Sequence, residues 1–378
     1  MTVNLRALLE EMIEKDASDL HITAGERAKV RIDGDITNAA APDVLTPKDT
    51  LALAYSVLTE NQKKRFETED ELDFSFGIQN LARFRGNVFK QRGCVAMVIR
   101  MIPFNVRTFQ DLGLPPIISK LAERPRGLIL VTGPTGSGKS TTLAAVIDKI
   151  NKERKGHIIT VEDPIEFIHR HQGCIVNQRE VGTDTNSFQA ALKYALRQDP
   201  DVVLVGEMRD LDTISSALTI AETGHLAFAT LHTNSAAESI NRIIDVFPSH
   251  QQSQVRAQLA FVLEGVVTQT LLQKSKGRGR VMAAEIMVCT PAIRALIRDD
   301  KVHQIESAMQ AGKKYGMQTL NDALYQLYVN REVAKEECMR VTSNPNEFLR
   351  MIGEAPVDER GEGGAAAAPA GAKVAARR

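Results

Sequence analysis

A glycine-rich loop at residues 133–140, Gly-Pro-Thr-Gly-Ser-Gly-Lys-Ser, constrains this chain more than any other feature of its sequence. It follows an apolar run at 127–132 and precedes a helix-like stretch at 141–147, which is the strand-and-helix setting of a phosphate-binding loop. The glycines let the backbone curl so that successive N–H groups point at phosphate oxygens. The positive end of the following helix faces the same anion. The sequence therefore predicts a nucleotide site on an α/β sheet.

The residues predicted to hold the nucleotide run from the start of this loop into the first turn of the helix. Lys139 is expected to reach the β- and γ-phosphates, and the Ser140 hydroxyl is expected to ligate Mg²⁺. The predicted cofactors are therefore ATP and Mg²⁺. The full predicted set is Gly133, Pro134, Thr135, Gly136, Ser137, Gly138, Lys139, Ser140 and Thr141.

Composition limits the possible partners and the compartment. Lys and Arg total 47, as do Asp and Glu, so the chain has no net charge that would attract nucleic acid or a membrane surface. No stretch approaches the roughly 20 apolar residues of a membrane span, and no apolar leader opens the chain, so we expect a cytoplasmic protein. The four cysteines are far apart and never form a Cys-x-x-Cys pair, which argues against a zinc or redox motif.

Residues 1–102 are predicted to form a small α+β domain. Apolar residues recur at helical spacing near the start, and alternating patterns predict several strands, with a turn at Asp33-Gly34. The predicted elements are a helix at 5–13 and strands at 19–23, 28–32, 72–76, 82–89 and 95–100. Residues 103–118 are rich in proline and are interpreted as an interdomain linker.

Residues 119–353 are predicted to form an α/β domain, because strand-like runs alternate with helical patterns as in a parallel sheet. Strands are expected at 127–132, 157–161, 201–205 and 225–230, with helices near 140–151, 187–198 and 211–222. A long helical pattern is interpreted at 249–273, followed by a strand at 281–288 and helices near 291–298, 303–311 and 319–330. The Ala- and Gly-rich segment 354–378 is predicted to be disordered.

Two of the predicted strands end in acidic residues, where a parallel sheet binds its ligands. Glu162, Asp163 and Glu166 follow the second strand and are expected either to hold Mg²⁺ or to orient an attacking water; a solvated acidic turn is the alternative. After the third strand, Gly206 stands where a metal-binding Asp is often found, so Glu207 is the first choice for polarising the water. A structural ion pair of Glu207 with Arg209 is the alternative.

Thr230 and His232 end the fourth strand of the predicted sheet. They are expected to lie beside the phosphate site and to sense the γ-phosphate by hydrogen bonding. A lone histidine is more often a structural residue, but its position at a third polar strand end favours a functional role.

Five motifs in order resemble those of the secretion and type IV pilus ATPases, and within that family those of the pilus retraction motors. Residues 133–141 match its Walker A motif, 159–166 its aspartate box, 205–210 its Walker B motif and 223–235 its histidine box. Residues 292–299, Ala-Ile-Arg-Ala-Leu-Ile-Arg-Asp, are similar to an element of the retraction motors, with Asp299 where they carry Glu. The resemblance spans nearly all of residues 1–352.

The resemblance implies a fold, a mechanism and partners. It implies a homohexamer in which each subunit joins an N-terminal PAS-like α+β domain to a RecA-like P-loop ATPase domain, with nucleotide between the two domains. It implies a Mg-dependent ATPase motor that powers type IV pilus retraction, hence twitching motility and pilus disassembly. The implied partners are an inner-membrane platform protein at the pilus base and a second retraction ATPase, and no nucleic acid is expected.

Basic residues of the N-terminal domain are implied to stabilise the charge of the transferred phosphate, and the candidates here are Arg83, Arg85 and Arg100. Arg83 and Arg85 share one face of a strand by their spacing. Without the resemblance, these residues would be interpreted as a solvated basic face. The predicted catalytic residues are Glu207, Glu162, His232, Arg83, Arg85 and Arg100, and the predicted metal ligands are Ser140, Glu162 and Asp163.

Three other functions fit part of the sequence. A pilus assembly or type II secretion ATPase usually carries a longer N-terminal region and a four-cysteine metal element, and neither is present here. A RecA-like nucleic-acid translocase needs a basic or aromatic track, yet the chain has no Trp and 5% aromatic residues. A nucleotide-binding regulator that never turns over is disfavoured by the intact Glu207, Glu162 and Lys139.

Overall fold

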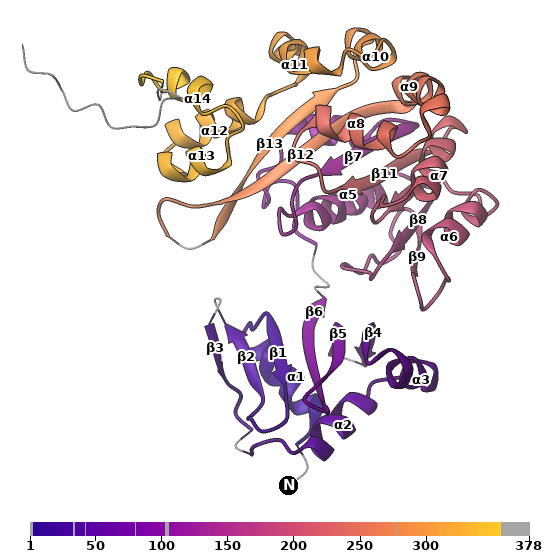
Figure 1. The fold of residues 1–378 in the computed structure, drawn as a ribbon, viewed down its shortest axis with the longest axis vertical. Coiled ribbons are helices and arrows are strands. Elements are labelled where there is room, and N and C mark those ends of the chain that lie inside the picture. Colours follow the sequence, from indigo (N-terminus) through magenta and orange to yellow (C-terminus); the bar gives the residue numbers. More distant parts are fainter. Residues whose placement is uncertain are drawn as a thin grey trace, which may run out of the picture.

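The computed structural model describes residues 3–32, 35–41, 43–79, 81–102, 106–277 and 279–356. Within these ranges the chain forms an antiparallel sheet followed by a mostly parallel one, each with its own helices (Figure 1). The predicted α/β fold class with an N-terminal α+β part is confirmed, and the sheet of that N-terminal part is antiparallel. The turn predicted at Asp33-Gly34 and residues 357–378 of the predicted disordered tail lie outside the described residues.

The N-terminal sheet has the strand order β3-β2-β1-β6-β5-β4, with antiparallel pairing between all described neighbours. Its strand β5 buries every second residue, so the sheet has a core face and a more exposed face. The elements are α1 (Leu5–Glu14), β1 (Asp19–Ile22), β2 (Lys29–Ile32), β3 (Asp35–Asn38), α2 (Pro47–Tyr55), α3 (Glu60–Glu69), β4 (Glu71–Ile78), β5 (Ala82–Gln91) and β6 (Cys94–Ile102).

Helices α2 and α3 are not among the predicted elements, although each begins with a capping box. Thr46 and Asp49 exchange hydrogen bonds at the start of α2, and Thr59 and Gln62 do so at the start of α3. Only Phe66 of α3 is buried, so its weak apolar pattern gave no helical period. The caps were the available signal.

The second sheet has the order β13-β12-β7-β11-β10-β8-β9 and is parallel except for the β12–β13 pair. Its elements up to β12 are α4 (Pro116–Ala122), β7 (Gly127–Thr132), α5 (Lys139–Glu153), β8 (His157–Glu162), β9 (Ile175–Glu180), α6 (Phe188–Ala195), β10 (Val202–Val205), α7 (Leu211–Glu222), β11 (Leu226–Leu231), α8 (Ala236–Asp245), α9 (Ser249–Val262) and β12 (Leu263–Gln273). The remaining helices and strand are β13 (Arg280–Val288), α10 (Pro291–Arg298), α11 (Ile305–Ala311), α12 (Leu320–Val329), α13 (Lys335–Val341) and α14 (Pro345–Met351).

Helices cover both faces of this sheet, which explains why its central strands are continuously apolar. In β7, Leu128 and Leu130 pack into the core cluster that includes residues of α6–α9, whereas Ile129 and Val131 pack into the cluster formed with α4 and α5. Within the described ranges no helix is both long and apolar enough to cross a bilayer.

The helix predicted over 249–273 is wrong in its second half. Helix α9 ends at Val262, and Leu263 begins β12, which pairs in parallel with the central strand β7 and antiparallel with β13. A strand buried on both faces has no alternating pattern, so its apolar residues mimic a helical period. The β-branched run Val266-Val267-Thr268 was the signal for a strand.

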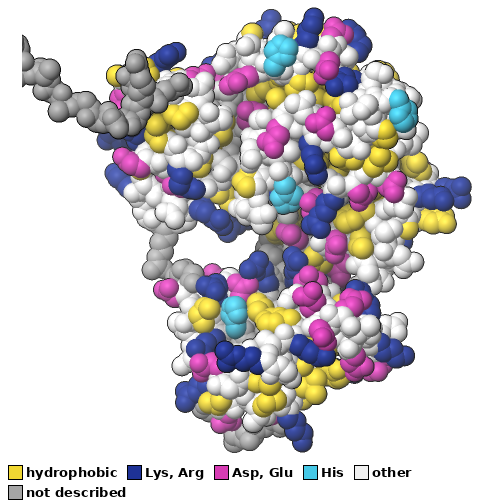
Figure 2. All heavy atoms as spheres, in the orientation of Figure 1, with side chains coloured by type: hydrophobic (Ala, Val, Ile, Leu, Met, Phe, Trp, Pro, Cys, Tyr) yellow, Lys and Arg dark blue, Asp and Glu magenta, His cyan; other side chains and the backbone are white. Residues whose placement is uncertain are grey.

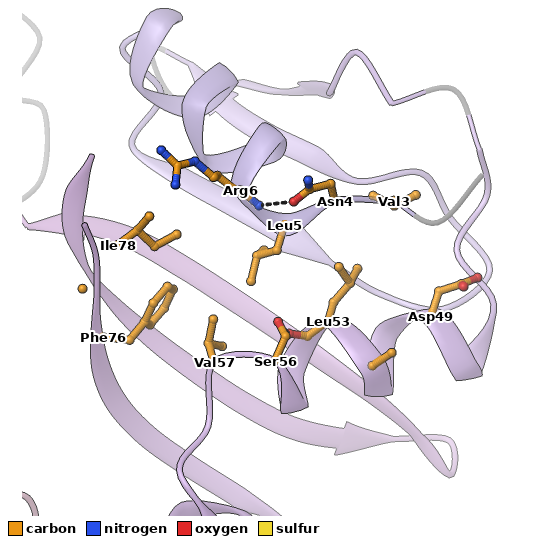
Figure 3. A pocket seen from close by; sticks show the side chains of 12 residues that line it. Val3, Asn4, Leu5, Arg6, Asp49, Leu53, Ser56, Val57, Phe76 and Ile78 are labelled. Carbon is orange, nitrogen blue, oxygen red and sulfur yellow. Dashed lines mark hydrogen bonds between the residues drawn. The ribbon is translucent and has the colours of Figure 1, made fainter. Parts of the chain in front are cut away.

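One cavity of about 690 Å³ belongs to the N-terminal part alone. It lies between α1, α2 and β4, where the side chains of Leu5, Val57 and Phe76 point toward one another (Figure 3). Asn4 at its edge caps α1 by accepting the Arg6 backbone N–H at 2.9 Å. It shares no lining residue with the cavity at the phosphate-binding loop described below.

Candidate functional site

The carboxyl ends of β7, β8, β10 and β11 surround a cavity of about 480 Å³. This is where an open α/β sheet binds its ligands. The predicted residues that line the cavity are Thr135, Gly136, Gly138, Lys139, Ser140, Thr141, Glu162, Asp163, Glu166, Glu207, Thr230, His232, Arg85 and Arg100. Of the other predicted residues, Gly133 and Ser137 are buried, Pro134 lines a neighbouring cavity, and Arg83 does not line this one.

The loop between β7 and α5 needs glycine at two positions for steric reasons. Gly133 has φ +138°, and a Cβ there would meet the Gln269 carbonyl oxygen and lie 2.7 Å from Ser137 Oγ. Gly138 caps α5 with φ +90°, and a Cβ there would lie 3.1 Å from Gln269 Nε2. Both positions thus combine a left-handed backbone with a close approach of β12.

Lys139 is held within the loop by the loop's own backbone. Its Nζ donates to the Gly133 carbonyl at 2.8 Å and to the Pro134 carbonyl at 3.2 Å, and the residue is 9% exposed. Burial lowers the pKa of Lys139, while the charges of Glu207 and Glu166 act in the opposite direction. The Lys139 ammonium group is therefore already positioned against the loop backbone, where its N–H groups can donate to phosphate oxygens.

Glu207 connects two charged neighbours at the end of β10. Its Oε2 lies 2.8 Å from Arg209 Nη2 and its Oε1 lies 3.3 Å from His232 Nε2. Burial alone would raise the pKa of Glu207, but the Arg209 hydrogen bond and charge, with His232 and Lys139, outweigh it and hold that pKa below its ordinary value. Glu207 is therefore ionised at neutral pH and able to accept a hydrogen bond from water.

His232 bridges Glu207 to the phosphate-binding loop. Its Nδ1 lies 3.5 Å from the Thr135 hydroxyl, so the imidazole stands between the loop and the acid. Thr230 donates to the Gly206 carbonyl, and Met208 N–H donates to the Thr230 carbonyl at 3.0 Å. These bonds fix the end of β11 to the segment that presents Glu207.

In the acidic turn after β8, the pKa values of Glu162 and Asp163 are shifted in the opposite direction from that of Glu207. Thr160 donates to Glu162 at 2.6 Å, yet burial outweighs its hydrogen bonds and raises the pKa of Glu162. Burial also raises the pKa of Asp163, against the charges of Arg209 and Arg85. Of Glu162, Asp163 and Glu207, only Glu207 thus has surroundings that lower its pKa.

Two of the three predicted arginines reach the cavity from the N-terminal sheet. The β5–β6 register sets Arg85 directly opposite Arg100, and both line the cavity. Arg100 Nη2 lies 2.7 Å from Asp19 Oδ1, whereas Arg85 lies 3.9 Å from Asp73. Basic and acidic side chains gather where the two parts of the molecule meet (Figure 2). The cavity therefore has cations from both parts of the chain.

Arg83 contacts a different acid. Its Nη2 donates to Ser75 Oγ at 2.7 Å and lies 3.4 Å from Glu180 Oε2, and Ser75 donates to Glu180 at 2.7 Å. Glu180 is 2% exposed and also accepts the backbone N–H of Ile165, in the acidic turn, at 3.2 Å. We call Arg83, Ser75 and Glu180 the interdomain latch, because Glu180 belongs to the second sheet and the other two to the first.

Part of the cavity wall was not predicted from the sequence: Phe188, Leu271 and Arg280 also line the cavity. Leu271 and Arg280 come from β12 and β13, and the wrong helix prediction over 249–273 hid their proximity to the loop. No local motif marks them, because an antiparallel hairpin brings them to the site.

Comparison with known proteins gives one family and close relatives. The family described as Type II/IV secretion system protein matches residues 2–340. The chain is 49% identical over 346 residues to the type IV pilus retraction ATPase PilT of Pseudomonas aeruginosa, covering 92% of this chain and 100% of that protein. It is 45% identical over 333 residues to a twitching motility protein of Neisseria gonorrhoeae, covering 86% and 89%.

A solved structure is similar over the same length. The crystal structure of the pilus retraction motor PilT with bound ADP matches with a TM-score of 0.87 and 50% sequence identity, covering 92% of this chain and 99% of that one. The similarity thus extends over both sheets and the cavity between them.

Proposed function

This chain belongs to the family of type II/IV secretion system proteins, and from that premise we propose that it hydrolyses ATP to power the retraction of type IV pili. The observation that carries the proposal is the convergence of Lys139, the ionised Glu207 and the paired Arg85 and Arg100 on one cavity. A P-loop that only binds nucleotide needs no acid held in its charged form beside cations from another domain.

The hydrolysis step follows from the positions of these groups. The loop backbone and Lys139 bind the β- and γ-phosphates, so Lys139 exchanges its bonds to the Gly133 and Pro134 carbonyls for phosphate oxygens. Glu207 accepts a hydrogen bond from a water, orients its oxygen toward the γ-phosphorus and takes up the water's proton as that oxygen attacks, returning the proton to solvent afterwards. The new P–O bond forms as the bond to the β-phosphate oxygen breaks, and ADP and phosphate leave. His232 holds Glu207 against the loop throughout.

The residues at the cavity fit Mg²⁺ bound together with a nucleotide. Ser140, Glu162 and Asp163 all line the cavity and carry oxygen ligands, and in the described part of the chain no cluster of three or more His, Cys, Asp and Glu forms an all-protein metal cage. We infer that Ser140 ligates the ion directly and that the two acids hold its waters. When bound, Mg²⁺ neutralises charge on the phosphate oxygens.

Removing the Ser140 hydroxyl is therefore expected to raise the Mg²⁺ concentration needed for half-maximal ATPase activity about tenfold, the scale of one lost ligand or ligand-orienting contact. The measurement is a Mg²⁺ titration of phosphate release by wild type and Ser140→Ala. Ser119→Ala, which removes a hydroxyl of α4 that donates to Glu123, is the control, because Ser119 does not line the nucleotide cavity. A Mg²⁺ requirement unchanged in Ser140→Ala would contradict the ligand assignment.

We also propose the assembly and location that the resemblance implies. Six copies form a ring at the cytoplasmic face of the inner membrane and act on a platform protein at the pilus base, with a second retraction ATPase as a further partner. Domain boundaries at residues 102 and 118 belong to the same proposal. Within it, the angle between the two parts of the chain changes with the nucleotide, because Arg85 and Arg100 reach the nucleotide from the N-terminal part.

Two assays test the proposal: one measures ATPase activity, and the other measures pilus retraction in cells. ATPase activity of the purified chain, with and without DNA, tests the chemistry and separates a motor from a translocase, whose activity DNA would stimulate strongly. Pilus retraction in cells that lack the protein tests the biological role: retraction is expected to stop and to return with the wild-type chain. Normal retraction without the protein would overturn the pilus role and leave the ATPase assignment standing.

A further inference from the structure

Gln269 of β12 contacts the phosphate-binding loop from the neighbouring strand. Its Nε2 donates to the Ser137 carbonyl at 2.8 Å, and the residue is 2% exposed. The pairing of β12 with β7 brings it there, because Thr268 is the register partner of Thr132, the last residue before the loop. Thr132 and Thr268 are themselves joined by a hydroxyl–hydroxyl bond of 2.8 Å.

The contact between Gln269 and Ser137 is incomplete. Among the described residues, Gln269 Oε1 and Ser137 Oγ are both buried and both lack a hydrogen-bond partner. One is a carbonyl acceptor and the other a hydroxyl donor, and they belong to two residues already joined by a hydrogen bond. Buried polar groups are nearly always paired, so these two atoms can gain stabilisation from a small movement of the loop.

Strand β12 continues from this contact to the C-terminal helices. Leu271 lines the nucleotide cavity, and the next residue, Leu272, packs in the hydrophobic cluster that contains Leu324, Cys338 and Phe348 of α12, α13 and α14. Gln273 N–H donates to Glu337 of α13 at 3.2 Å. Figure 1 shows these helices beside the long β12–β13 hairpin.

The loop and α13 also border a common cavity. Pro134 of the loop, Gln269 and Arg340 of α13 line this cavity of about 240 Å³, which shares no lining residue with the nucleotide cavity. Gln269 therefore stands between the loop and the C-terminal helices.

We propose that Gln269 is a positioning residue that fixes the phosphate-binding loop to β12 and transmits nucleotide occupancy to α12–α14. When the loop closes on phosphates, the Ser137 hydroxyl donates to Gln269 Oε1 and adds to the bond at the Ser137 carbonyl. The paired amide then restrains β12, and through Leu272 and Gln273 it restrains α13. The inference rests on the proposed function only in requiring that the loop binds a nucleotide.

The test replaces Gln269 by methionine, which keeps the volume and removes both hydrogen-bonding atoms. We expect ADP affinity to fall and the KM for ATP to rise about tenfold, with kcat changed by less than about threefold, because the lost interaction positions the loop and does not touch the reacting atoms. Gln318→Met is the matched control: it removes a similar amide bond, 2.7 Å to the Ala284 carbonyl of β13, away from the loop. It is expected to leave nucleotide affinity unchanged.

Hydrogen exchange of the α13 amides distinguishes transmission from a purely structural role of Gln269, because a structural role would not change how ADP affects α13. ADP is expected to slow exchange of the α13 amides in wild type and in Gln318→Met, and to slow it much less in Gln269→Met. The proposal would be overturned if both methionine variants lost ADP affinity equally. It would also be overturned if ADP slowed exchange of the α13 amides as much in Gln269→Met as in wild type. These measurements use ADP binding alone, so they stand apart from the assays of hydrolysis and retraction.

Ser137→Ala tests the missing bond without altering β12. The backbone carbonyl that accepts from Gln269 remains, and only the hydroxyl is lost. We expect this variant to weaken ADP binding and to make the further effect of Gln269→Met smaller than in wild type, as for two residues that share one interaction. Fully additive effects of the two substitutions on ADP affinity would contradict a nucleotide-dependent bond between them.

Discussion

Replacing Glu207 by glutamine is expected to lower ATP turnover by about 10²- to 10⁴-fold, the range of a lost general base, while ATP still binds. The physical reason is that Arg209, His232 and Lys139 hold the pKa of Glu207 below its ordinary value despite its burial, so this acid is ionised beside the loop. Glutamine keeps the shape and cannot accept a proton. The measurement is steady-state phosphate release, together with equilibrium binding of a fluorescent ATP analogue.

Two further variants make this result specific. Glu162→Gln is expected to cost less turnover than Glu207→Gln, because burial raises the pKa of Glu162 and so favours its neutral form. Glu153→Gln, on the exposed end of α5, is the surface control and is expected to behave as wild type. A larger loss in Glu162→Gln than in Glu207→Gln would reassign the base to the acidic turn.

Arg85→Ala is expected to lower kcat by about 10³- to 10⁵-fold, the scale of a lost charge-stabilising arginine. Arg83→Ala, two residues away on the same strand face, is expected to leave kcat within about tenfold of wild type, because an ion pair outside the reacting charge contributes little to the transition state. Arg85 lines the nucleotide cavity, whereas Arg83 bonds to Ser75 and Glu180. The two variants therefore distinguish an arginine that acts on the phosphate from one that joins the two sheets.

Arg83→Ala is expected to lower the stability of the folded chain. It leaves the buried Glu180 with neutral donors only, and we expect the free energy of unfolding to fall by about 1–3 kcal/mol, the penalty of an undercompensated buried polar group. Urea unfolding followed by circular dichroism measures it. If Arg83→Ala loses as much kcat as Arg85→Ala, the two arginines act together on the phosphate and the structural assignment of Arg83 is wrong.

The sequence predicted the fold wherever a motif or a period was strong. The phosphate-binding loop fixed β7 and α5, and continuous apolar runs gave β8, β10 and β11 because a parallel sheet buried on both faces has no polar positions. The same property defeated the prediction at 263–273, where a buried central strand mimicked a helix. Helices α2 and α3 were missed because their weakly apolar faces show no clear period, and only their capping boxes marked them.

The site was predictable only in part for a related reason. The loop, Glu162, Glu207 and His232 follow strands and could be placed along one edge of the sheet by the rule for parallel strands. Gln269, Leu271 and Arg280 reach that edge through the β12–β13 hairpin, which no local pattern announces. The choice between Arg83 and Arg85 depended on Glu180, whose position opposite Ser75 is a fact of tertiary structure.

The interdomain latch has a mechanical consequence. Glu180 holds Arg83 and Ser75 of the N-terminal sheet with one pair of oxygens, and with the same pair it accepts the backbone N–H of Ile165, two residues after Asp163. A load that pulls the N-terminal part away from the second sheet is therefore borne by the group that also positions the acidic turn. We expect tension on this protein to reach its chemical site through Glu180, so that an opposing force slows hydrolysis before it separates the domains.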